Sequence, residues 1–134
     1  MNSLDNYKDL PDGLQSDEVN RLTKTCLSES SHEGDSITLR KLWHLGSHQY
    51  HTYKLPPDDI RGRLSLWMTE NSALWSDEDL VKALAVANMY GLEKGLFRNL
   101  LERCPDDRKP QFEKTLAASK GNLIDPYHDL RKVD

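Results

Sequence analysis

The stretch "WSDEDLVKALAVANMYG", residues 75–91, predicts the helix around which the rest of the chain folds. Ser76 and Asp79 have the spacing of a capping box, in which a serine hydroxyl and an acidic side chain three residues later satisfy the first amide groups of a helix. Trp75 and Leu80 have the spacing of a hydrophobic staple across the same boundary. These two signals together predict a helix that starts at Ser76.

The body of this helix, "LVKALAVANMY", is apolar on most of its sides, which is typical of a helix surrounded by others. Gly91 follows it and can adopt the left-handed conformation that commonly closes a helix. We therefore expect this helix to be the central and most buried one. Helical periodicity continues on both sides of it, from Pro57 onward and as far as Pro105. The apolar residues that recur there are Ile60, Leu64, Trp67 and Met68 before it, and Leu92, Leu96, Phe97, Leu100 and Leu101 after it.

A further helix is predicted from Asp35 or Ser36 toward Leu55, because Pro56 disfavours helical geometry in the residue before it. Its apolar residues recur at helical spacing and predict one core-facing stripe, made of Leu39, Leu42, Trp43, Tyr50 and Tyr53. Gly46 lies on the same side of this helix. The glycine either lets another helix approach closely or divides this helix into two shorter pieces.

Shorter helices complete the pattern at both ends of the chain. The first begins at Ser16, with acidic residues in its first turn, and the polar run "SESSHEGDS" (28–36) is predicted to end it as a loop. The run "PDDRKP" (105–110) is likewise predicted as a loop, which leads to a short sixth helix closed by Gly121. No alternating apolar run supports a β-sheet of useful size.

These elements predict an all-α fold, with a single compact domain of five to six short helices in an irregular bundle. A length of 134 residues suits one domain. We expect a flexible N-terminal lead-in at residues 1–13, the helical domain at residues 14–121, and a C-terminal tail, docked or free, at residues 122–134.

The composition excludes several classes of protein. A net charge of −4 argues against a general binder of nucleic acids or membrane surfaces, because those partners are anionic. The longest apolar run, "ALAVA" (83–87), is far too short to span a membrane, and the first residues lack the pattern of a signal peptide. Cys26 and Cys104 are too few for a disulfide framework and have no metal-type spacing. We therefore expect buried thiols, no cofactor and a cytoplasmic location.

A basic and aromatic segment, residues 40–54, lies between two acidic regions. Its candidate binding residues are Arg40, Lys41, His44, His48, His51 and Lys54. The three histidines recur at helical spacing opposite the apolar stripe, which fits a solvated face, a patch for an anionic ligand or partner, or a Zn²⁺ site. No acidic residue between 37 and 57 could orient ligating histidines, which disfavours the metal. If the segment is a binding patch, affinity for an acidic partner should increase below about pH 6.5.

Asp77, Glu78 and Asp79 form a second candidate surface, an acidic patch. Three carboxylates in succession could hold a cation. At the start of a helix they are explained more simply, because the helix dipole favours negative charge there.

"GDSIT" (34–38) and "DPYH" (125–128) together resemble the two ends of the GDS-type esterase and lipase family. The resemblance implies a nucleophilic Ser36, with His128 taking its proton and Asp125 orienting the imidazole. That family places its serine directly after a buried strand, whereas the residues before this serine are the polar "SESSHE". A helix start capped by its own aspartate or serine explains the first motif without catalysis.

The sequence contains no glycine-rich phosphate loop, no HExxH and no nucleophile elbow. An acidic helical domain without such patterns favours a module that binds another protein, such as an immunity or antitoxin-like inhibitor, an adaptor or a chaperone. A basic partner would suit its charge. Two alternatives stay open: anion or nucleic-acid contact through residues 40–54 and, more weakly, hydrolysis by Ser36 with His128. A homodimer through the helix predicted from Asp35 would use the aromatic residues that a monomer would bury.

Overall fold

The computed structural model describes residues 16–51 and 55–127, with all side chains except those of Ser16, Gln49 and His51. Six α-helices make up most of this part of the chain. The helices are α1 (Ser16–Glu33), α2 (Asp35–His51), α3 (Asp58–Asn71), α4 (Asp77–Tyr90), α5 (Lys94–Arg103) and α6 (Lys109–Ala118), and the short 3₁₀ turns η2 (Ser72–Leu74) and η3 (Asp106–Arg108) precede α4 and α6. Within this part, β structure is limited to an isolated bridge between Glu93 and Leu123. The predicted all-α fold is confirmed.

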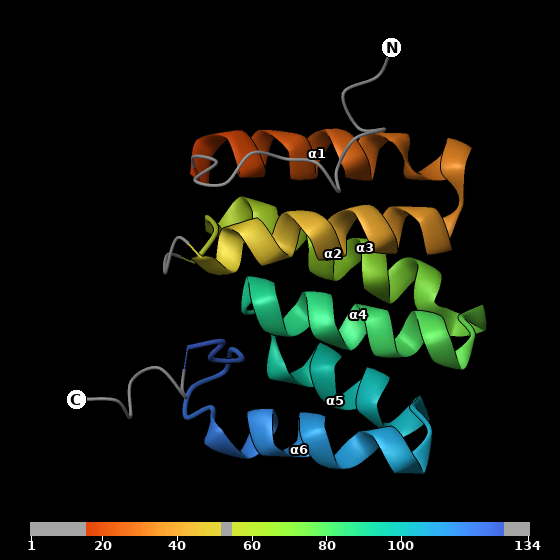
Figure 1. The fold of residues 1–134 in the computed structure, drawn as a ribbon, viewed down its shortest axis with the longest axis vertical. Helices are drawn as coiled ribbons and strands as arrows, with labels where there is room; N and C mark the ends of the chain where they lie inside the picture. Colours follow the sequence, from red (N-terminus) through yellow and green to blue (C-terminus); the bar gives the residue numbers. More distant parts are fainter. Residues whose placement is uncertain (1–15, 52–54, 128–134) are drawn as a thin grey trace.

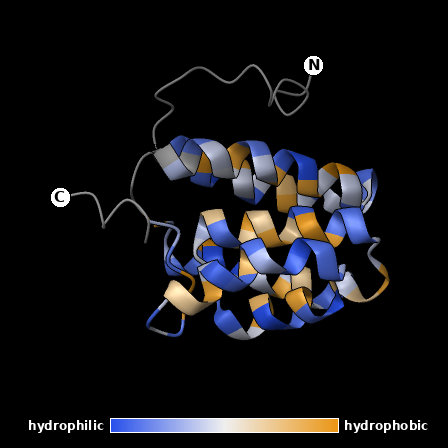
Figure 2. Cartoon of the chain, turned by 60° about the horizontal axis from the view of Figure 1, so that its bottom comes forward, coloured by the Kyte–Doolittle hydropathy of each residue, from blue (hydrophilic) through white to orange (hydrophobic). Residues whose placement is uncertain are grey.

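The helices alternate in direction along the chain, each turning back toward the one before it (Figure 1). α2 packs on both α1 and α4, α4 also packs on α5, and α5 packs on α6. As a result α2 and α4 lie side by side, run in the same direction and begin at the same end of the bundle. Hydrophobic and hydrophilic residues alternate along the helices (Figure 2), as expected where each helix turns one face to its neighbours.

α4 is central in the bundle, as predicted. Its fully buried residues are Ala83, Leu84, Val86, Ala87 and Tyr90. The Ser76 side chain accepts a hydrogen bond from the amide of Asp79 at 3.2 Å, and Gly91, with φ of 68°, closes the helix in the left-handed conformation. The apolar residues predicted for α3 and α5 are buried as well, except for the half-buried Leu96. None of the described helices is long and apolar enough to cross a membrane.

The apolar stripe predicted on α2 is partly wrong. Its two leucines are fully buried, but so is Leu45, which lies outside the predicted stripe. Trp43 is 37% exposed and Tyr50 is half-buried, while Tyr53 lies outside the described residues. The reason is that α2 packs against two helices, α1 and α4, so its buried face is wider than a single stripe and is turned away from Trp43.

Gly46 allows α2 and α4 to approach each other closely, and α2 is continuous through it. A Cβ atom at Gly46 would lie 3.0 Å from ring atom Cε1 of Tyr90 and 3.1 Å from Cε of Met89. The described part of α2 runs to His51, residues 52–54 lie outside the described residues, and Leu55 is outside any helix. A residue that precedes a proline is disfavoured in the helical region, which explains why Leu55 is not helical.

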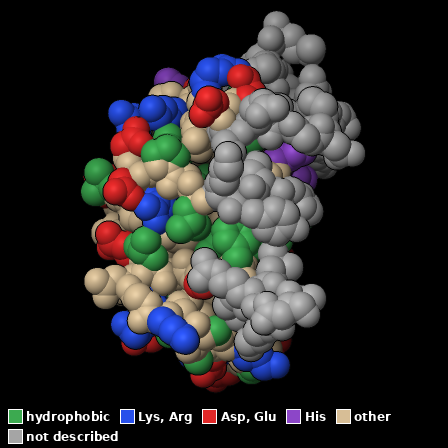
Figure 3. Space-filling view, turned by 90° about the vertical axis from the view of Figure 1, so that its left-hand side faces the viewer, with side chains coloured by type: hydrophobic (Ala, Val, Ile, Leu, Met, Phe, Trp, Pro, Cys, Tyr) green, Lys and Arg blue, Asp and Glu red, His purple; other side chains and the backbone are tan. Residues whose placement is uncertain are grey.

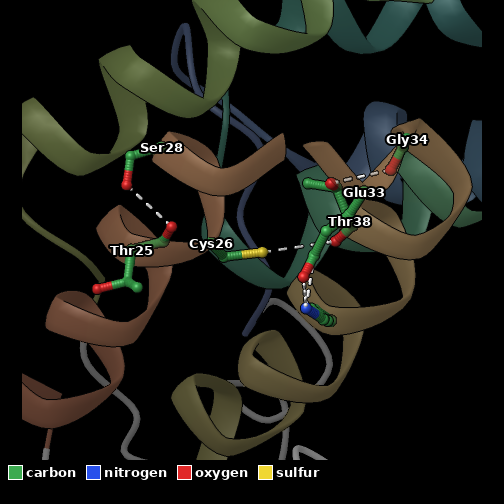
Figure 4. Close-up of polar contacts among 7 residues, drawn as sticks. Thr25, Cys26, Ser28, Glu33, Gly34 and Thr38 are labelled. Atoms are coloured by element: carbon green, nitrogen blue, oxygen red, sulfur yellow. Dashed lines mark hydrogen bonds and ion pairs between the residues drawn. The ribbon is translucent and has the colours of Figure 1, made fainter. Parts of the chain in front are cut away.

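The polar run predicted to form a loop instead continues α1 as far as Glu33. The Ser28 hydroxyl donates to the carbonyl of Thr25 at 2.9 Å (Figure 4). The serine therefore bonds back to the preceding turn, so its side chain does not compete with the helix for backbone groups. Gly34 alone separates α1 from α2, and its φ of 89° makes the tight turn possible.

Polar contacts hold the hairpin of α1 and α2 together. The Cys26 thiol donates to the carbonyl of Thr38 at 3.8 Å, and the Lys41 ammonium lies 2.5 Å from a carboxylate oxygen of Glu33 (Figure 4). Cys26 and Cys104 are both buried and free, as predicted for structural thiols.

A buried hydrogen bond joins α1 to α4. The hydroxyls of Thr23 and Tyr90 are 2.8 Å apart, and both side chains are fully buried. Thr23 donates its own proton to the Val19 carbonyl at 2.9 Å, so the Tyr90 hydroxyl must be the donor to Thr23. The two helices are thereby held in one register relative to each other.

Residues 119–127 lie against the start of α5. The Ile124 amide donates to the carbonyl of Leu92 at 2.8 Å, and the Lys94 amide donates to the carbonyl of Asn122 at 2.9 Å. This part of the predicted tail is therefore docked. The predicted lead-in and the last seven positions of the tail lie outside the described residues.

Two predicted boundaries near α6 are wrong. The run 105–110, expected as a loop, contains η3 and the first two residues of α6, where Pro110 fits because the first turn of a helix tolerates proline. α6 ends at Ala118 and does not reach Gly121, because Ser119 already has extended backbone geometry, with ψ of 123°.

Candidate binding groove

The basic segment 40–54 does not form one continuous cationic surface in the part that the structure describes. Arg40 is exposed, but the ammonium of Lys41 is paired with Glu33. The end of the bundle at which α2 stops carries lysine and arginine side chains mixed with aspartate and glutamate (Figure 3). An anionic ligand would therefore meet both positive and negative side chains at this end.

The histidines of this segment are less exposed than a solvated helix face would require. His44 and His48 are half-buried, and the ring of His44 packs edge-on against Trp43, with the ring centroids 4.9 Å apart. The side chain of His51 and the whole of Lys54 lie outside the described residues. Among the side chains that are described, no group of three potential ligands could hold a metal ion.

Ser36 and Asp125, two of the three catalytic residues implied by the GDS resemblance, lie near opposite ends of α4. The Ser36 hydroxyl is 2.9 Å from both carboxylate oxygens of Asp79, at the start of this helix. Asp125 lies at the other end of this helix, because it follows Ile124, whose carbonyl oxygen would be 3.3 Å from a Cβ atom added at Gly91. The helix rises about 18 Å between these two points, at roughly 1.5 Å per residue, which is too far for one imidazole to bridge. His128 itself lies outside the described residues.

The three acidic residues at the start of α4 have different surroundings. Asp79 is half-buried and accepts a hydrogen bond from the Ser36 hydroxyl at the start of α2, whereas Asp77 and Glu78 are exposed. Nearby, the carboxylate of Asp35 accepts the indole N–H of Trp75 at 2.6 Å. Asp35 and Asp79 therefore tie α2 to the start of α4, and Asp77 and Glu78 are the exposed members of the acidic triplet.

A groove of about 710 Å³ opens along the outer face of α4. Its floor is made by Val81, Ala85 and Met89, which recur every four residues along one row of the helix. Trp43 of α2 forms one wall, and Phe112 of α6 forms the other. The groove is open because α6 packs mainly on α5, so α6 does not cover this face of α4.

Trp43 is the large aromatic side chain in the wall of this groove. It is 37% exposed, and the ammonium of Lys82 lies 4.9 Å from its ring centroid. The cation holds the indole in place by attraction to the face of the ring. Exposed tryptophans at the edge of an apolar groove are typical anchors in protein interfaces.

Asn88 contributes a polar atom without a partner. Its side-chain oxygen Oδ1 is shielded from solvent and accepts no hydrogen bond from the described residues, and its side chain lines the groove. A buried amide oxygen that lacks a donor costs about 1–3 kcal/mol. Because the oxygen is shielded, a donor in the groove would reach it only after rotation of the Asn88 side chain.

Charge is distributed unevenly along the groove. Its end at the start of α4 carries three exposed acids, Asp77, Glu78 and Asp107, for which no ion pair is found within the described ranges. Arg108 lines the same end. The charged residues that line the groove are these three acids, Arg108 and Lys82, so the lining has an excess of one negative charge, and no charged residue lines the groove beside Met89.

A second hollow, of about 720 Å³, lies between α3 and α5. The Arg103 guanidinium in this hollow is already paired, because it donates to the Ser72 carbonyl at 2.7 Å and to the Asn99 side chain at 3.0 Å. The buried Ser65 hydroxyl has no partner among the described residues, but no aromatic side chain lines the hollow, whereas the groove on α4 has the exposed Trp43. The groove on α4 is therefore the stronger candidate for a binding site.

Sequence reasoning missed this groove, although it singled out three of the residues that form it. Asp77 and Glu78 were predicted as part of an acidic patch, and Trp43 was predicted as a core residue. The apolar residues of the floor looked like part of a helix covered on all sides. One signal was present, because the polar residues Glu78, Lys82 and Asn88 share one side of α4.

Comparison with known proteins identifies no relative. No family model, no curated protein and no solved structure matches this chain. The function is therefore inferred from the groove itself.

Proposed function

We propose that this protein is a protein-binding module, and that the groove on α4 docks a segment of a partner protein. The observation that carries the proposal is the exposed indole of Trp43 beside the open apolar floor of a helix whose other sides are buried. An apolar centre with a polar rim is the usual composition of a protein interface. Here the rim is supplied by the acids at the start of α4.

One binding activity of this kind serves several biological roles. An immunity or antitoxin-like inhibitor, an adaptor and a chaperone each work by holding a segment of another protein. The net charge of −4 favours a basic partner for any of them, and association with such a partner should slow as salt rises.

The other functions considered from the sequence have weaker support. Contact with an anion or nucleic acid through residues 40–54 would have to use Lys41, which is paired with Glu33. Hydrolysis by Ser36 would need Asp125, which lies at the far end of α4. Neither alternative has a described cluster of side chains to support it.

Selection from a random peptide library on the immobilised full chain, followed by NMR titration with a selected peptide, tests the proposal. We expect the shifted amide signals to belong to α2, α4 and the start of α6. Ala85→Arg should weaken binding at least about tenfold, because its side chain would fill the floor of the groove. Thr69→Arg, at an exposed position of α3, is the matched control and should leave binding unchanged. Shifts that map to another face, or equal binding by both variants, would contradict the proposal.

A further inference from the structure

We infer that the segment docked in the groove is an amphipathic α-helix that brings lysine or arginine side chains to the acidic end of the groove. This inference rests on the proposed function and names the class of partner. The backbone chemistry of the groove, the shape of its floor, its charge and the unpaired oxygen of Asn88 each support it.

Backbone chemistry favours a helix over an extended peptide. The floor and walls of the groove come from α4, α2 and the η3–α6 region, and helices satisfy their own backbone groups internally. No sheet edge is present among the described residues to pair with an added strand. An extended peptide would therefore leave its buried backbone groups without partners, whereas a helix brings its own hydrogen bonds with it.

The shape of the floor fits about three turns of helix. The groove follows α4 from Asp77 to Met89, which is about 18 Å at roughly 1.5 Å per residue. The small side chain of Ala85 lies between Val81 and Met89 and lets a second helix backbone approach closely at the centre. Trp43 and Phe112 then flank the apolar face of the docked helix.

Charge determines which end of the docked helix is basic. Asp77, Glu78 and Asp107 are exposed, and Arg108 is the basic residue that lines this end of the groove with them. Lys109, which also lies near, is paired with Asp106 at 3.0 Å. The ammonium of Lys82 lies over Trp43, farther along the groove. The end with excess negative charge therefore attracts cationic side chains, and the Met89 end receives the apolar part of the partner.

Asn88 adds a requirement for a hydrogen-bond donor. Its Oδ1 atom is shielded and without a partner among the described residues, near the apolar end of the groove. A donor side chain on the docked helix, such as glutamine or serine, would satisfy this oxygen. A partner that lacks the donor would leave the oxygen unpaired inside the interface, which lowers affinity.

Three designed peptides of about three to four helical turns test the inference by fluorescence anisotropy. The first has a leucine-rich face and three lysines at one end, the second has glutamates in place of those lysines, and the third is the lysine peptide with a central proline. We expect the lysine peptide to bind about tenfold or more tightly than either of the others, and its affinity to fall as salt rises. The protein is used as the full chain throughout.

Charge-reversal variants locate the contact. Asp77→Lys combined with Glu78→Lys should reverse the preference between the first two peptides, and Asp107→Lys alone should reduce it. The control is Glu70→Lys combined with Glu102→Lys, at exposed positions on α3 and α5 that do not line the groove. Circular dichroism confirms that each variant is folded, and the Asp107 variant keeps the test decisive if reversal at the start of α4 unfolds that helix.

Equal binding of the lysine and glutamate peptides, or a preference unchanged by the charge reversals, would overturn the inference. If no designed helix binds but library-selected peptides still shift signals in the groove, the docked segment is not a basic helix and the protein-binding function stands. If no peptide from either source binds in the groove, the proposed function has failed as well.

Discussion

Replacing Gly46 by alanine tests the close packing of α2 on α4. In a helix interior this exchange normally contributes about 1 kcal/mol of stability. Here the new Cβ atom would lie 3.0 Å from the ring of Tyr90 and 3.1 Å from Cε of Met89. The Tyr90 ring cannot recede easily, because it is fully buried and its hydroxyl is bonded to Thr23. Overpacking costs roughly 1–3 kcal/mol, so the free energy of unfolding should fall by about 0–2 kcal/mol.

Gly62→Ala is the matched control for this experiment. Gly62 lies inside α3, and a Cβ atom there would meet no other atom within 4 Å. We expect this variant to be stabilised by about 1 kcal/mol, so that the two variants differ by roughly 1–3 kcal/mol. Urea unfolding followed by circular dichroism measures both. If Gly46→Ala were as stable as Gly62→Ala, the close approach of α2 and α4 would be refuted.

Three further variants test other contacts in the fold and the groove. Thr23→Val should lower the free energy of unfolding by about 1–3 kcal/mol, because the Tyr90 hydroxyl would lose its buried acceptor. The same substitution should cost less in a chain that already carries Tyr90→Phe. Additive losses in this double-mutant cycle would show that the two hydroxyls do not interact. Burial raises the pKa of the Cys26 thiol from its ordinary value near 9 to about 12. As pH rises, the unfolded chain therefore loses this proton before the folded chain does, so the stability that is present below pH 9 should decline toward pH 12. The urea midpoint should fall more gently with pH across this range in Cys26→Ala than in the unchanged protein. Equal slopes would contradict the raised pKa of Cys26. Asn88→Leu should leave stability unchanged or higher by about 1 kcal/mol and weaken the binding of donor-bearing peptides, whereas a large loss of stability would mean that the amide oxygen is paired.

Local signals in the sequence were sufficient to predict α4 and the helices before and after it in the chain, α3 and α5. The cap at Ser76 and the closing glycine at Gly91 each act within a few residues, so their effect does not depend on the rest of the fold. The apolar repeats of α3 and α5 are also local, and the structure buries nearly all of them. These elements could be predicted because the signals that mark their ends and their apolar faces lie close together in the sequence, although most of their stability comes from packing against other helices.

The errors occurred where two local outcomes were equally accessible. Ser28 can stabilise either a loop or a helix, and it bonds back to Thr25 within α1 because that helix packs along α2. The stripe on α2 was placed on the wrong residues, since periodicity assumes one packed face and this helix has two packed neighbours. In both cases packing against another helix decided between the alternatives.

The sequence by itself determined a chain of amphipathic helices, their main starts and stops, and the acidic residues at the start of α4. Only the tertiary structure decided that the Val81, Ala85 and Met89 row stays uncovered, that Trp43 stands beside it, and that Asp107 joins Asp77 at one end. The physical reason is that periodicity shows which residues are apolar, whereas exposure depends on where the other helices pack. Because α6 packs on α5, it leaves this face of α4 open, and that open face is the candidate binding site.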